Sequence, residues 1–143
     1  MTKDDMVGVY RQVGEDVVNA DGSMTTDDRR NSQIMYSPDG YMGVVSTPGG
    51  RSKISGSDGR MDLNGATPEE RAESAKNLVC YAGHYELKGD TVLHHVEMAL
   101  NPNLMGQTVI RRVNIDGPNL TLSSVPDKDG NYRRIRWRRV GVK

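Results

Sequence analysis

The chain of 143 residues contains one cysteine, Cys80, and no long run of apolar residues. A single cysteine excludes an internal disulfide and a metal site built from several thiolates. No apolar stretch approaches the length of a membrane-spanning helix, and the N-terminus MTKDDMVGVY does not resemble a signal peptide. We therefore expect one soluble, cytoplasmic domain over residues 1–143, with a core of its own. Cys80 lies in the apolar stretch NLVCYA, where we expect a helix and a buried structural thiol.

The local motifs of common enzyme classes are also missing. We find no phosphate-binding loop, nucleophile elbow or dinucleotide-binding fingerprint, and no internal repeat of fixed period. We therefore expect no cofactor.

Positive charge is scarce in the first two thirds of the chain and concentrated in the last third. Residues 1–97 hold 16 acidic and 10 basic side chains, whereas residues 98–143 hold 3 and 9. Five arginines lie between Arg133 and Arg139 in YRRIRWRRV, which raises the hypothesis of a nucleic-acid surface. On a strand, however, Arg134, Arg136 and Arg138 share one face and Ile135 and Trp137 the other. We favour a solvated outer face over a buried Ile/Trp pair, and expect no nucleic acid and no membrane as partners.

Short segments of alternating apolar and polar residues fill most of the sequence. Turn signals such as SPDGY, KGD, NPNLMG and DGPN separate them. This pattern predicts strands near residues 6–19, 32–37, 41–47, 83–88, 91–100, 107–116, 119–125 and 132–140.

One helix interrupts the strands, in TPEERAESAKNLVCY. Thr67 is its expected N-cap, Pro68 its first residue and Glu70 the closing member of a capping box. Before it lies a glycine-rich stretch, residues 48–66, that is long for a loop. A lid and a flexible connection are both open interpretations of this loop.

About eight consecutive antiparallel strands with one helix predict an all-β, up-and-down β-barrel with a central cavity. Closure removes the exposed edges of the sheet, and a barrel of this size can hold one small ligand.

The adjacent histidines His94 and His95 must point to opposite faces of their strand. A two-residue turn at Gly89–Asp90 pairs Tyr85 with His94, on a face that also carries Leu87, Val92, Val96 and Met98. This face is the more apolar one, so His94 and Tyr85 should point inward. The other face carries His84, Glu86, His95 and Glu97, which we interpret as exposed polar residues without a bound metal.

The next hairpins extend the same interior. Taking NPNLMG as the connection pairs Met98 with Val109, Val96 with Arg111, His94 with Val113 and Val92 with Ile115. Across DGPN, Leu120, Leu122 and Ser124 join this face. An inward Arg111 either packs against carbonyls at a barrel mouth or awaits an anionic or carbonyl-bearing ligand.

An ordered set of motifs carries a family resemblance: GVYRQV, MYSPDGYM, ATPEE, YAGHYEL, TVLHHVEMALNPNLMG, IRRVNIDGPNLTLSS and RWRRV. Together they resemble the bacterial and fungal lipocalin-like domain proteins, over nearly the whole chain. The resemblance implies a calycin-type barrel with an internal cavity. Lipocalins proper carry Gly-x-Trp on the first strand, packed by an arginine from the last; Gly8-Val9-Tyr10 matches with Tyr for Trp, and Arg138 or Arg139 could supply the arginine.

Two functions follow as hypotheses. The first is a cofactor-independent isomerase, cyclase or lyase acting on a small, largely apolar or aromatic metabolite, with His94 as general base, Arg111 stabilising an enolate or carboxylate, and Tyr85 as proton donor. The second is a non-catalytic carrier or sensor that uses the same residues only to orient its ligand. The remaining residues expected at the ligand are Tyr36, Tyr41, Tyr81, Val96, Met98, Asn103, Val113, Leu122, Ser124 and Trp137. A homodimer, formed between the Arg-rich last strand and the acidic first half, is a further hypothesis.

Overall fold

The computed structural model describes residues 1–56 and 58–141 and contains nine strands in one antiparallel sheet. The strands are β1 (Gly8–Val18), β2 (Met24–Asp27), β3 (Asn31–Tyr36), β4 (Tyr41–Thr47), β5 (Val79–Lys88), β6 (Thr91–Ala99), β7 (Thr108–Asp116), β8 (Asn119–Ser124) and β9 (Tyr132–Gly141). The helical elements are α1 (Lys3–Met6), α2 (Pro68–Ala75) and the 3-10 turn η1 (Pro102–Leu104).

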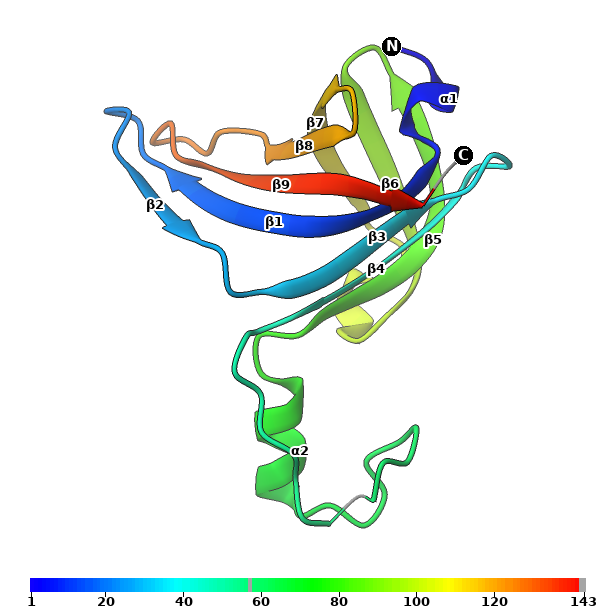
Figure 1. Cartoon of the computed structure of the whole chain (residues 1–143), viewed down its shortest axis with the longest axis vertical. Coiled ribbons are helices and arrows are strands. Elements are labelled where there is room, and N and C mark those ends of the chain that lie inside the picture. The colour runs from blue at the N-terminus through cyan, green and yellow to red at the C-terminus, as the bar shows by residue number, and fades with distance from the viewer. Residues whose placement is uncertain (57, 142–143) are drawn as a thin grey trace.

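Eight strands close into a barrel because β9 pairs with β1 as well as with β8 (Figure 1). This confirms the predicted up-and-down barrel. The remaining strand, β2, was not predicted; it is only four residues long and pairs with the second half of β1 outside the ring. β1 is long enough to pair with two strands: β3 pairs with its first half and β2 with its second half.

Helix α1 and a cluster of aromatic side chains fill one end of the barrel. The ring of Tyr36 packs edge-on against Tyr10 and Tyr85, with ring centroids 6.3 and 4.9 Å away. Tyr10 donates a hydrogen bond to the carbonyl of Met6, which is fully buried. This end is closed by packing.

The arginine that packs on the first strand is Arg139. Its guanidinium lies 5.1 Å from the ring centroid of Tyr10 and donates to the Tyr10 hydroxyl over 2.6 Å and to the Asp5 carbonyl over 2.7 Å. Tyr10 thus takes the place that the resemblance gives to tryptophan, and Arg139 rather than Arg138 supplies the cation.

The predicted helix begins correctly but ends early. Thr67 and Glu70 form the expected capping box, with Glu70 N donating to Thr67 Oγ1 over 3.1 Å and Thr67 N donating to Glu70 Oε1 over 3.0 Å. The helix stops at Ala75, and Asn77 takes a left-handed conformation with φ 59°. Cys80 and Tyr81, expected at the helix end, lie instead on β5, because pairing with Val45 and Val44 of β4 supplies backbone hydrogen bonds that override the local helical pattern.

The 48–66 loop and α2 project away from the barrel between β4 and β5 (Figure 1). No side chain of α2 is buried. Residue 57 of this loop lies outside the part of the chain that the structure describes.

The predicted register between β5 and β6 is confirmed: Tyr85 faces His94, and His84 faces His95. Opposite Ala82 and Gly83, β6 carries one extra residue, Glu97, and this bulge reverses the alternation of β6. A Cβ on Gly83 would collide with the His95 carbonyl oxygen, so the bulge requires glycine here. Met98 was predicted inside, but the bulge turns it outward, where it is 59% exposed.

The predicted register between β6 and β7 is wrong by four residues. His94 pairs with Val109 rather than Val113, and Val92 with Arg111. The connection between the two strands is longer than NPNLMG. The backbone N–H of Val96 donates to the Gln107 carbonyl and the Val96 carbonyl accepts from Gly106 N–H, so the chain closes around η1, and the last residues of β6 pair only with β5. An even shift preserves the faces, so Arg111, Leu122 and Ser124 still share the interior side.

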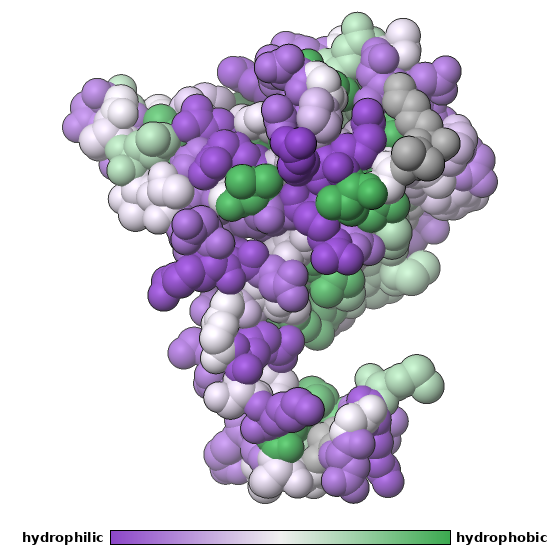
Figure 2. Space-filling view, viewed as in Figure 1, coloured by the Kyte–Doolittle hydropathy of each residue, from purple (hydrophilic) through white to green (hydrophobic). Residues whose placement is uncertain are grey.

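The outer face of β1 and β9 is polar, as predicted for the arginine-rich strand. Figure 2 shows hydrophilic residues over most of this side of the molecule. Arg134 Nε and Arg136 Nε donate to the buried carboxylate of Asp16 over 3.0 and 3.1 Å, and Thr26 of β2 donates to its other oxygen. Along the described chain, no helix is long and apolar enough to cross a membrane.

Candidate functional site

The interior of the barrel holds a cavity of about 540 Å³ at the end opposite α1. Its walls are largely apolar, and polar side chains lie at its inner end and around its mouth. The lining residues are Gln12, Glu15, Val17, Thr25, Asp27, Arg30, Ile34, Val44, Ser46, Asn77, Leu78, Val79, Tyr81, His94, Arg111, Leu122, Ser124, Arg133, Ile135 and Trp137. A volume of this size suits a small organic ligand.

His94 lies at the inner end of this cavity and is held on both sides. It is 1% exposed, with Tyr36 Oη 2.7 Å from Nε2 and Tyr81 Oη 2.7 Å from Nδ1. The three side chains come from β3, β5 and β6, whose inward positions converge here.

The position of each proton in this triad follows from its partners. Tyr36 is fully buried, and its hydroxyl has no partner other than His94 among the described residues. If Nε2 carried the ring proton, the Tyr36 hydroxyl proton would be buried without an acceptor. Tyr36 therefore donates to Nε2, and Nδ1–H donates to Tyr81. The Tyr81 hydroxyl proton is then free to point into the cavity.

Burial drives every titratable group of the triad towards its neutral form. It lowers the pKa of His94 to about 3, with the charge of Arg111 as the second cause. It raises the pKa of Tyr81 to about 12, opposed by the charge of Arg111. The pKa of Tyr36 is raised well above its ordinary value for the same reason. At neutral pH the triad is uncharged.

Among the residues that the structure describes, Arg111 is the one positive charge that acts on all three members of the triad. It lies on β7 opposite Ser124 of β8, lines the cavity, and donates from Nη1 to its neighbouring Ile110 carbonyl over 2.8 Å. Arg111 forms no ion pair with any acidic side chain of the described chain.

Two buried nitrogen donors on the β1–β9 side of the cavity lack a hydrogen-bond partner among the described residues. They are Nε2 of Gln12 and Nε1 of Trp137, which lie opposite each other on the two paired strands. Trp137 is 3% exposed. Such unpaired buried donors cost free energy in the unliganded protein.

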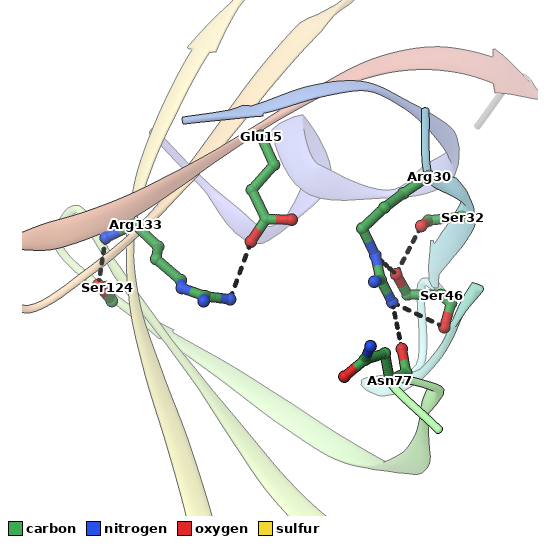
Figure 3. Close-up of polar contacts among 7 residues, drawn as sticks. All are labelled: Glu15, Arg30, Ser32, Ser46, Asn77, Ser124 and Arg133. Carbon is green, nitrogen blue, oxygen red and sulfur yellow. Dashed lines mark hydrogen bonds and ion pairs between the residues drawn. The ribbon is translucent and has the colours of Figure 1, made fainter. Parts of the chain in front are cut away.

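The mouth of the cavity is ringed by polar contacts from opposite walls (Figure 3). On one wall Arg133 donates to Glu15 over 3.2 Å, and its backbone N–H donates to Ser124 Oγ. On the other, Arg30 donates to Ser46 Oγ over 2.9 Å and to the Asn77 carbonyl over 2.7 Å. Arg30 thereby ties the segment that carries α2 to the barrel.

The predicted site residues fall into three groups. His94, Arg111, Tyr81, Leu122, Ser124 and Trp137 line the cavity together. Tyr36, Tyr85, Val96 and Val113 point inward but belong to the packed core, where Tyr36 touches His94 and the Tyr85 hydroxyl donates to the Ser37 carbonyl.

The third group lies outside the barrel. Tyr41, at the start of β4, is 57% exposed because its neighbour Met42 takes the inward position. Met98 is turned outward by the bulge, and Asn103 lies exposed in η1. These three residues, predicted to contact a ligand, do not line the cavity.

Several lining residues were missed by sequence reasoning, chiefly Gln12, Glu15, Arg30 and Arg133. Gln12 follows Tyr10 by two residues, and Arg133 precedes Ile135 by two, so strand alternation could have placed both inside. Glu15 could not be found this way, because a bulge after Gln12 reverses the faces of β1. Arg30 lies just before β3, outside any alternating segment, so the sequence does not indicate where its side chain points.

The outward histidines pair with glutamates. His84 contacts Glu97 over 2.6 Å, His95 contacts Glu86 over 2.8 Å, and the two rings stack with centroids 4.6 Å apart. No group of three or more potential metal ligands occurs among the residues that the structure describes.

Comparison with known proteins gives the family and little else. No curated protein matches the chain. One similar solved structure is an uncharacterized protein from Bacteroides eggerthii DSM 20697, at 10% identity and a TM-score of 0.48, covering 94% of this chain and 99% of that one. The model of the lipocalin-like domain family matches residues 7–140, nearly the whole barrel. The chain therefore belongs to the lipocalin-like domain family.

Proposed function

We propose that the protein binds a small, largely apolar organic molecule inside the barrel, with its polar end against His94, Tyr81 and Arg111. The observation that carries this proposal is the cavity itself: about 540 Å³, apolar along its walls and polar where it ends. Concave apolar sites with a few convergent polar groups are typical of small-molecule binding.

Binding without chemistry fits the protonation of the triad better than general base catalysis does. An effective general base has a pKa near the working pH. The pKa of His94 is lowered to about 3, and hydrogen bonds to Tyr36 and Tyr81 occupy both of its ring nitrogens. A carrier or sensor needs only the donors that these residues present.

An acid–base enzyme of the isomerase, cyclase or lyase type is the second candidate, favoured by the continuous chain Tyr36–His94–Tyr81. In an enolisation Tyr81 would donate its hydroxyl proton to the substrate oxygen while a water molecule takes the proton from the α-carbon, which gives the neutral enol. The Nδ1–H of His94 would stabilise the transient Tyr81 anion until solvent returns the proton, and Arg111 would stabilise the negative charge that develops on the substrate oxygen. Tyr85 takes no part in this scheme, because its hydroxyl bonds the Ser37 carbonyl.

Ligand binding is tested with 2-naphthamide, a neutral aromatic probe, by calorimetric titration of three proteins. Val44 is buried against the cavity and Val45, its neighbour, is 49% exposed on the outer face. Val44→Phe should narrow the cavity and weaken binding by about tenfold or more, whereas Val45→Phe should leave binding nearly unchanged. Equal effects of the two substitutions, or no binding to the parent protein, would contradict the proposal.

Catalysis is tested separately by hydrogen exchange. In D₂O the α-protons of the ketone 2-tetralone exchange slowly, and a general acid–base site accelerates this exchange. We expect no acceleration by the protein. Acceleration that is lost in His94→Gln and Tyr81→Phe would support the enzyme instead.

A further inference from the structure

The cavity presents several hydrogen-bond donors to an occupant. The Tyr81 hydroxyl accepts from His94 and keeps its own proton for the cavity. Gln12 Nε2 and Trp137 Nε1 are buried donors without partners among the described residues. Ser124 Oγ, an acceptor near the mouth, is already used by the backbone N–H of Arg133. An occupant therefore gains most by supplying oxygen acceptors.

Charge separates an anionic occupant from a neutral one. At the mouth, Arg133 is paired with Glu15, and Arg29 is paired with Asp27, where its backbone and side-chain hydrogen bonds are the main reason that the pKa of that carboxyl group is lowered. Arg111 forms no ion pair with an acidic side chain within the described chain, and its guanidinium donates to the Ile110 carbonyl. A cation that lines a low-dielectric cavity without a counter-charge favours an anionic ligand.

The apolar walls of the cavity limit the chemistry of the rest of the ligand. Ile34, Val44, Leu122 and Ile135 form apolar walls around the approach to Arg111. A group with two oxygens and a single negative charge can accept hydrogen bonds from a guanidinium and from neighbouring donors. A dianion would carry more negative charge than the single positive charge of Arg111 can neutralise.

We propose that the ligand of this cavity is an apolar monocarboxylate, aromatic or aliphatic, whose carboxylate is bound by Arg111 and the Tyr81 hydroxyl. This inference rests on the proposed function and specifies its ligand class. The carboxylate supplies the counter-charge of Arg111 and accepts a hydrogen bond from the Tyr81 hydroxyl. The apolar body then fills the space towards the mouth.

The test compares 2-naphthoate with 2-naphthamide, which share a shape and differ in charge, by calorimetric titration at pH 7. The parent protein should bind the acid about tenfold or more tightly than the amide. Arg111→Gln should reduce this ratio to about one, by weakening binding of the acid more than binding of the amide, and Arg111→Lys should retain part of the preference because the charge remains.

Arg112→Gln is the matched control. Arg112 is the next residue on β7, is exposed, and points to the outer face, so its loss changes the net charge equally without touching the cavity. The acid preference should survive in this variant.

The outcomes separate the inference from the proposed function. Equal binding of acid and amide to the parent protein would overturn the carboxylate assignment and leave small-molecule binding intact. Acid preference that persists in Arg111→Gln, or disappears in Arg112→Gln, would also overturn it, since the charge that matters would then lie elsewhere. If neither probe binds, both proposals fall together.

Discussion

Replacement of His94 by glutamine should change how stability depends on pH. In the unfolded chain a histidine has an ordinary pKa of about 6.5, whereas burial lowers the pKa of folded His94 to about 3. Between these values the unfolded state binds the extra proton, so stability falls as pH falls. The contribution is fully present above pH 6.5 and decreases by about 1.4 kcal/mol per pH unit below it. Between pH 7.5 and pH 5, His94 should therefore cost the protein roughly 2 kcal/mol.

The assay is urea unfolding of the parent protein and His94→Gln at pH 7.5 and pH 5. The parent should lose roughly 2 kcal/mol more than the variant between these values. His84 and His95 are present in both proteins, so their contributions cancel in this difference. Because glutamine also loses hydrogen bonds, the variant will be less stable at pH 7.5, but only the change with pH is diagnostic. Parallel losses in the two proteins would refute a buried, neutral His94.

Three further substitutions test the frame around the cavity by thermal or urea unfolding. Arg139→Met should cost about 2 kcal/mol, because it removes charged hydrogen bonds and a cation–π contact at the closed end; Arg138→Met should cost little. Gly83→Ala should cost about 2 kcal/mol through its collision with a backbone carbonyl, whereas Gly43→Ala, with its nearest neighbour 3.7 Å away, should be tolerated. Asp16→Asn should cost about 2 kcal/mol, because two arginines lose their carboxylate.

Each of these predictions has a clear contradiction. An Arg138 effect as large as that of Arg139 would mean that the aromatic end is not held as described. Equal losses of stability in the two glycine variants would show that the bulge does not require glycine at position 83. An Asp16→Asn variant as stable as the parent protein would show that the ion pairs with the outer arginines do not stabilise the fold.

The barrel was predictable because its signals are local and repeated. Two-residue turns and strict alternation place Tyr85 opposite His94 without any tertiary information, and the capping box at Thr67 starts a helix for local reasons. The inward arginine was found for the same reason, since alternation on β7 is unbroken from Arg111 to Ile115.

What failed depended on interactions between distant segments. The bulge in β6 opposite Gly83 turns Met98 outward, and no residue pattern on β6 indicates it. The end of α2 was misplaced because Cys80 and Tyr81 gain strand partners on β4, which local helical periodicity cannot reveal. Tyr81, the most informative residue of the site after His94, was therefore expected for the wrong structural reason.

The most direct test of the account is the location of a bound probe by NMR. Methyl-labelled protein with 2-naphthoate should give intermolecular NOEs to Ile34 and Leu122, which line the cavity. NOEs confined to Met35, Val45 and Met98, which line an apolar groove on the outer surface, would place the ligand outside the barrel and contradict the central claim.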